Sequence, residues 1–167
     1  MEPGRDAWDL LKQVWLTDGP GQILLPVDPV ELARKIGILV LDDDELESEV
    51  SVILRKKPGF WDPEILLNPI VTIDRRRFIC AHAIGHYSRN IELRRDGAWE
   101  FVDGRDFFAV NSDPEESYAT EFAAELLMPR EVLKALDDSA SVASLAALFG
   151  VTGDVMSARL DRIGWRR

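Results

Sequence analysis

Apolar side chains recur at helical spacing near the start of the chain, and turn-forming residues then interrupt them. This pattern predicts a first helix over residues 6–16, which ends before the turn formers of 18–21. A second helix is predicted to begin after Asp28, a suitable N-cap, with Pro29 at its first position, and to stop at Gly37. Local residues therefore mark the end of the first predicted helix and both ends of the second.

Three short apolar runs predict strands at residues 38–41, 50–54 and 65–68. Acidic residues dominate 42–49, and this run is most simply a solvated loop between the first two strands. Turn formers are frequent in 56–63, before the third strand. We expect the three strands to form one small sheet.

The second half of the chain is predicted to be mostly helical, with helices over residues 75–87, 114–128, 130–136, 139–149 and 154–163. The last two helices are joined by a short turn that contains glycine, and they should form a helix-turn-helix-like hairpin. The segment 92–113 has no clear period. We expect a loop or a weak hairpin there, which could border a substrate cleft.

The chain has 167 residues, of which 46% are hydrophobic, so it can bury one substantial core. We expect a main domain over residues 1–138 and a C-terminal hairpin over 139–167 that packs on or beside it. The net charge of −10 argues against a surface that neutralises phosphates, because such a surface needs clustered Lys and Arg. Direct DNA binding is therefore disfavoured.

The start of the chain predicts neither export nor membrane insertion. Residues 1–8 lack the basic and apolar segments of a secretory signal, and no run approaches the roughly 18 apolar residues of a membrane span. Cys80 is the only cysteine, so no disulfide can form within the chain. Together these features predict a cytoplasmic protein.

His82 and His86 are the only histidines, and they stand four residues apart in the predicted helix 75–87. Residues at this spacing project from one face of a helix, so two imidazole nitrogens can meet one metal ion at about 2.0–2.1 Å. The alternative is that both are satisfied polar residues of the helix, and spacing alone leaves both interpretations open. The pair also matches the metal-binding half of the His-Glu-x-x-His signature.

The glutamate of that signature is absent, and Ala83 stands in its place. In the complete signature this glutamate follows the first histidine and acts as a general base toward water. General acid–base catalysis contributes about 10²–10⁴-fold to a rate. We therefore expect a metal site in a chain whose catalysis is abolished or strongly impaired.

Two histidines need a further protein ligand, because a catalytic zinc normally has three and keeps its fourth position open. The predicted helix 114–128 offers four glutamates, and residue spacing leaves the choice open among Glu115, Glu116, Glu121 and Glu125. Glu116 is favoured by small residues one turn further on, which permit close packing of its face. Glu121 and Glu125 are more simply part of a solvated face.

Three other reactive side chains have simpler interpretations. Cys80 precedes His82 and His86 by two and six residues, so neither imidazole can reach it as a base from the same helix, and we expect a small core residue. Tyr87 and Tyr118 could donate a proton to an oxyanion by their chemistry, but packing is the simpler role for each.

Two blocks of the sequence are the most specific. Residues 75–86 end in Cys-Ala-His-Ala-Ile-Gly-His, and residues 116–129 end in Glu-Leu-Leu-Met-Pro. Together they resemble the ImmA/IrrE family of zinc metallopeptidases. The resemblance extends to residues 26–37, to Leu67-Asn68 and to the C-terminal hairpin, so it covers nearly the whole chain.

The resemblance implies an α+β fold with a thermolysin-like zincin core, in which a small twisted sheet packs on the metal-binding helix and further helices lie at both ends. It also implies Zn²⁺ as the cofactor. The implied ligands are His82, His86 and Glu116, the last matching the first glutamate of the family's second block. Thr120 departs from the Asn or Asp usual in that block, so a partner that orients a ligand could be weaker or supplied elsewhere.

Members of this family cleave helix-turn-helix transcriptional repressors. The resemblance thus implies a site-specific endopeptidase that relieves repression, with 50–54 as an exposed strand edge that could hold the substrate as an added strand. Ala83 stands where the family has glutamate, while the residues around it fit an active member. We interpret Ala83 as a replacement of a parental glutamate, made to trap an intact substrate or to avoid self-cleavage, in preference to a natural pseudoprotease.

Two hypotheses of other classes remain. One is a natural, non-catalytic, metal-containing regulator that binds a protein partner through the same groove, and cleavage by an Ala83→Glu variant would count against it. The other is a DNA-binding protein that uses the hairpin 139–163. Arg159, Arg162, Arg166 and Arg167 support that hypothesis, whereas Asp154, Asp161 and the acidic character of the whole chain oppose it.

Overall fold

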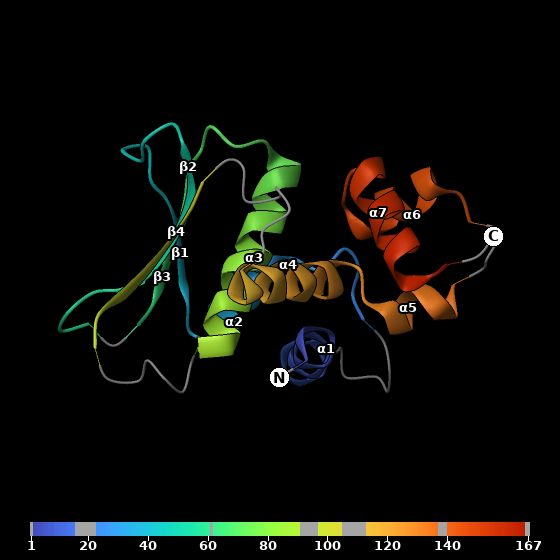
Figure 1. The fold of residues 1–167 in the computed structure, drawn as a ribbon, viewed down its shortest axis with the longest axis horizontal. Helices are drawn as coiled ribbons and strands as arrows, with labels where there is room; N and C mark the ends of the chain where they lie inside the picture. The colour runs from blue at the N-terminus through green and yellow to red at the C-terminus, as the bar shows by residue number, and fades with distance from the viewer. Residues whose placement is uncertain are drawn as a thin grey trace.

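The computed structural model describes residues 2–15, 23–60, 62–90, 97–104, 113–136 and 140–165. Its fold is α+β, as the sequence predicts (Figure 1). The helices are α1 (Pro3–Val14), α2 (Pro29–Lys35), α3 (Ile73–Asn90), α4 (Pro114–Leu127), α5 (Arg130–Ala135), α6 (Val142–Phe149) and α7 (Gly153–Ile163). The strands are β1 (Leu39–Asp42), β2 (Val50–Lys56), β3 (Glu64–Leu67) and β4 (Trp99–Gly104).

The four strands form one mixed sheet in the order β1-β3-β2-β4. β1 runs parallel to β3, while β2 is antiparallel to both β3 and β4. The expectation that residues 50–54 form an exposed edge is wrong, because β2 is hydrogen-bonded to a neighbour on each side. In the described part of the chain, β1 and β4 are the outer strands.

β4 is the element that the sequence did not predict as a strand. It lies inside the segment 92–113, for which a loop or a weak hairpin is expected, and it pairs with β2 along most of its length. The remainder of that segment, 91–96 and 105–112, lies outside the described residues. Along β4 the side chains alternate, with Trp99, Phe101 and Asp103 more buried than their neighbours. An acidic residue on this inner face interrupts the apolar pattern that marks a strand.

α3 is the central helix of the fold. It packs on β2 and β3 and against α4, which packs in turn on α1. In Figure 1, α3 and α4 lie between the sheet and the group formed by α5, α6 and α7. Residues from Phe78 to His86 of α3 are all buried. This accounts for its weak apolar periodicity, since a helix covered on most sides has little reason to be amphipathic.

The starts of α2 and α4 follow from N-caps that the sequence predicts. Asp28 accepts hydrogen bonds from the backbone N–H groups of Val30 and Glu31, and Asp113 accepts one from Glu115 at 2.8 Å. Pro follows each of these N-caps at the first helical position. α3 continues three residues past the predicted end, to Asn90, whose side-chain amide donates to the His86 carbonyl at 2.9 Å.

Arginine side chains join the hairpin of α6 and α7 to other described parts of the chain. Arg77 of α3 donates to the carbonyl oxygens of Val27 at 2.7 Å and Gly150 at 3.0 Å. Arg159 of α7 donates to the Met128 carbonyl at 3.1 Å. The expected boundary between residues 138 and 139 lies outside the described residues. Among the helices that are described, none has the length and apolar character needed to cross a membrane.

Candidate metal site

His82 and His86 lie one turn apart on α3 and face the same point. Their Nε2 atoms are 3.0 Å apart, and the rings meet edge to face with centroids 4.7 Å apart. Both side chains are buried, and the His86 ring also stacks on Phe101 of β4. The i, i+4 spacing therefore brings both imidazoles to one face of a helix that the core holds firmly.

Glu116, in the first turn of α4, reaches both histidines. Its Oε2 lies 3.3 Å from Nε2 of His82, and its Oε1 lies 3.3 Å from Nε2 of His86. Asp113 and Pro114 fix where α4 begins, so this cap also sets the position of the Glu116 carboxylate.

The other three glutamates of α4 point to different partners. Glu115 accepts a hydrogen bond from the Asn90 side chain at 2.6 Å. Glu121 is paired with Arg162, and Glu125 with Arg159. The expectation of a solvated face is wrong for Glu125, which is 7% exposed. Its partner comes from α7, far along the sequence, so the periodicity of α4 alone gives no sign of the burial.

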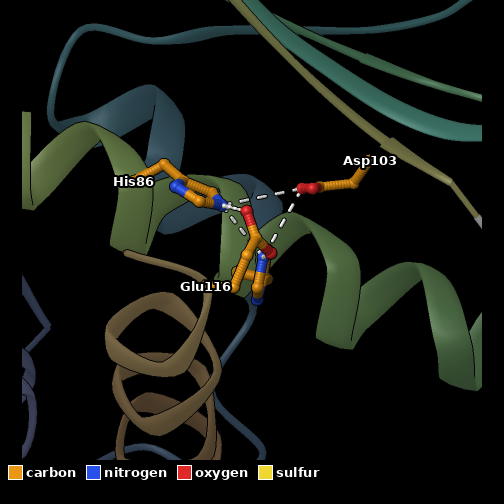
Figure 2. A group of neighbouring side chains, drawn as sticks. His86, Asp103 and Glu116 are labelled. Atoms are coloured by element: carbon orange, nitrogen blue, oxygen red, sulfur yellow. Dashed lines mark hydrogen bonds and ion pairs between the residues drawn. The ribbon is translucent and has the colours of Figure 1, made fainter. Parts of the chain in front are cut away.

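Asp103 is the site residue that sequence reasoning missed. Its Oδ2 lies 3.5 Å from Nε2 of His82 and 3.8 Å from Nε2 of His86. Figure 2 shows Asp103, His86 and Glu116 pointing toward one another from β4, α3 and α4. The signal in the sequence was the alternation of β4, which places Asp103 on the same face as two aromatic residues.

The electrostatics of the four side chains call for a positive charge among them. The pKa of Asp103 is raised to about 6, mainly by burial and also by the nearby Glu116 carboxylate, whereas His82 acts in the opposite direction. The hydrogen bond with His82 lowers the pKa of Glu116, against the effect of burial. The buried Asp103 carboxylate and the partly buried Glu116 carboxylate repel each other, and a cation bound between them would relieve that repulsion.

The distances fit one metal ion. Ligand atoms from the four side chains, His82, His86, Asp103 and Glu116, all lie within 4.8 Å of one another. Two atoms bound to one zinc at about 2.0–2.1 Å and at the tetrahedral angle lie about 3.3–3.4 Å apart. The histidine pair at 3.0 Å and the two Glu116 contacts at 3.3 Å are close to that spacing.

Gly85 allows α4 to approach this closely. A Cβ atom built on Gly85 would lie 2.9 Å from the Cα of Ala119 and 3.2 Å from the Cβ of Phe122. The sequence predicts a close approach here by the metal site or by a neighbouring strand. The expectation of a neighbouring strand is wrong, because the backbone that passes Gly85 belongs to α4.

Thr120 lies next to the second nitrogen of His82. Its Oγ1 is 3.4 Å from Nδ1, at the long end of hydrogen-bond distances. When the Nε2 of a histidine binds a metal, Nδ1 carries the proton and donates it to a neighbour that orients the ring. Thr120 is therefore placed as that neighbour, through a long contact.

Ala83, at the glutamate position of the His-Glu-x-x-His signature, is buried. Cys80 is buried in the core as expected, and burial raises the pKa of its thiol to about 12. The Tyr118 hydroxyl donates to Asp6 of α1 at 2.6 Å, away from the histidines. Tyr87 is partly buried beside Trp99, which fits the expected packing role.

The family Peptidase_M78, described as the IrrE N-terminal-like domain, matches residues 33–161. The chain belongs to this family. The match begins in α2 and ends in α7, so it includes the sheet, both helices of the site and the C-terminal hairpin. No curated protein matches the chain. Membership in this peptidase family and the cluster of four side chains together indicate a metal-binding, protease-type domain.

Proposed function

We propose that this chain is a zinc metallo-endopeptidase domain whose parent form cleaves a helix-turn-helix transcriptional repressor, and that it lacks the general base here. The observation that carries the proposal is the convergence of His82, His86 and Glu116 at ligand spacing within a fold of this peptidase family. Imidazole and carboxylate ligands suit zinc. Bound zinc would supply Lewis acidity toward a peptide carbonyl and toward water.

The chain's own residues would bind and orient the substrate. Among the described strands, β4 is an outer one and carries Asp103 of the site, so a peptide added along its edge would run past the histidines. Val102, which is 52% exposed on β4, is available for a side-chain contact with such a peptide. At position 83 an alanine can neither take a proton nor return one to the leaving amine, so the bound peptide would remain intact.

A repressor as substrate rests on the family resemblance, and it would place the activity in the cytoplasm. The alternative of direct DNA binding through the hairpin is not favoured. Arg159 is buried and engaged with Glu125 and the Met128 carbonyl, and Arg162 is paired with Glu121. Arg159 therefore cannot contact phosphates, Arg162 is exposed but already paired, and Arg166 and Arg167 lie outside the described residues.

Metal analysis of the purified chain combined with a cleavage assay tests the proposal. We expect about one zinc per chain, and loss of that zinc in His86→Ala. Repressors encoded near the gene should remain intact with the unaltered chain. Ala83→Glu should cleave one of them, and Ala83→Gln, which has the same shape but no base, should not. Absence of bound metal from every form would overturn the proposal.

A second candidate function is a non-catalytic regulator that holds a protein partner against the same strand. Ala83 itself favours it, because a metal site without a base can bind but cannot turn over. Zinc binding and partner capture, with no cleavage by Ala83→Glu, would support this function over the parental endopeptidase.

A further inference from the structure

Asp103 approaches the site from an element that neither histidine nor Glu116 belongs to. It lies on the inner face of β4, an outer strand of the sheet, and its side chain is 10% exposed. The pairing of β4 with β2 fixes the position of Asp103 along the sheet, because Asp103 stands opposite Val52 in the register. The backbone therefore holds this carboxylate over the histidines (Figure 2).

The atoms that Asp103 faces separate two possible roles. A residue that orients a metal-bound histidine contacts the nitrogen that does not bind the metal. Thr120 is placed in that way, because it faces Nδ1 of His82. Asp103 instead faces Nε2 of both histidines, the same two atoms that Glu116 faces. Asp103 thus shares the side of the histidines on which a metal would lie.

The distances separate a ligand from a general base. A general base does not bind the metal. It contacts the metal-bound water at about 2.6–3.2 Å, so it lies farther from the histidine Nε2 atoms than a ligand does. Asp103 is 3.5 Å and 3.8 Å from the two Nε2 atoms, slightly more than the roughly 3.3–3.4 Å between tetrahedral zinc ligands. A shift of a few tenths of an ångström would complete a four-ligand site.

We propose that Asp103 is a fourth protein ligand to the metal, so that two histidines and two carboxylates close the site. This inference rests on the metal site of the proposed function, and it adds that cleavage by Ala83→Glu requires Asp103 to give up its position to water or the metal to take a fifth ligand. A catalytic zinc keeps one position open for water, whereas a structural zinc has all four positions filled by protein. With Asp103 bound and Ala83 in place of a base, the chain holds its metal in the structural manner.

The test uses the cobalt-substituted chain and acetohydroxamate, a small chelator that needs an open coordination position. The unaltered chain should bind acetohydroxamate weakly and show the visible absorption of four-coordinate cobalt. Asp103→Asn should bind acetohydroxamate at least about tenfold more tightly, with a changed cobalt spectrum. Glu100→Gln is the matched control, because Glu100 is a half-exposed carboxylate of the same strand, and it should behave as the unaltered chain does.

Equal acetohydroxamate affinity and equal spectra in Asp103→Asn and the unaltered chain would overturn the inference, while bound metal in both would leave the proposed function standing. Failure of every form to bind cobalt or zinc would overturn both. If Asp103→Asn does not fold, a crystal structure of the zinc-loaded unaltered chain decides the matter. Asp103 Oδ2 at about 2.0–2.2 Å from zinc supports the inference, and a water in that position refutes it.

Discussion

Gly85 of α3 meets Ala119 of α4 so closely that a Cβ atom on Gly85 would lie 2.9 Å from the Ala119 Cα. This contact joins the helix that carries both histidines to the helix that carries Glu116. A glycine inside a helix costs about 1 kcal/mol relative to alanine. The close approach accounts for its presence, because only the absence of a side chain lets the first turn of α4 reach the metal site.

Gly85→Ala should destabilise the fold and weaken metal binding together. Overpacking a buried contact costs about 1–3 kcal/mol, which exceeds the gain in helix preference. The added methyl group would also push α4 outward and move Glu116 away from the histidines. Urea denaturation with a zinc competition assay measures both effects. Gly153→Ala is the control, since nothing lies within 4 Å of its Cβ position, and it should leave stability and zinc affinity nearly unchanged.

The parts of the site that could be predicted from the sequence are those that one helix fixes by itself. The i, i+4 spacing is enough to place His82 and His86 together, and the N-cap at Asp113 is enough to place the start of α4. To place Asp103 in the site, one must know how β4 pairs with β2, which is a long-range property of the sheet. The burial of Glu125 was missed for a similar reason, because its partner Arg159 lies 34 residues away in the sequence.

Thr120→Val should lower zinc affinity without a matching loss of stability in the metal-free chain. Valine keeps the shape of threonine but cannot accept a hydrogen bond from Nδ1 of His82. Loss of a partner that orients a metal ligand typically costs 10–100-fold in affinity. The contact here is long, at 3.4 Å, so we expect about tenfold. Competition with a chromogenic chelator measures the change, and an unaltered zinc affinity would show that Thr120 does not orient His82.

Arg159→Met should destabilise the chain far more than Arg162→Met. Both arginines lie on α7 and pair with glutamates of α4, but the Arg159–Glu125 pair is buried and the Arg162 side chain is 61% exposed. Removing one partner of a buried pair leaves an uncompensated charge and costs about 3–5 kcal/mol. An exposed pair contributes about 0–1 kcal/mol. Chemical denaturation of both variants measures the difference, and it also tests whether the proposed C-terminal hairpin unfolds together with the main domain.

If the buried charge is the cause, the double variant Arg159→Met, Glu125→Gln should recover part of the lost stability, because no unpaired charge remains. A double variant as unstable as Arg159→Met alone would instead assign the loss to the hydrogen bond between Arg159 and the Met128 carbonyl.

Cys80 should be unreactive in the folded chain and should make folding sensitive to alkaline pH. Because burial raises the pKa of its thiol to about 12, Cys80 stays protonated at pH 8, and a thiol-specific reagent should react at least about 100-fold faster after unfolding in urea. The unfolded thiol has a pKa of about 8.5. The folded state thus binds its proton more tightly, and the stability from this difference is present below pH 8.5 and is lost as the pH rises toward 12.

Cys80→Ala removes this titration, so the decrease in unfolding free energy between pH 8 and pH 10 should be smaller in that variant by about 2 kcal/mol. Urea midpoints at the two pH values measure the effect. The buried tyrosines titrate alike in both proteins and cancel in the comparison. Rapid reaction of Cys80 in the folded chain, or equal pH sensitivity of the two proteins, would contradict a buried thiol and reopen the interpretation of Cys80 as a reactive residue.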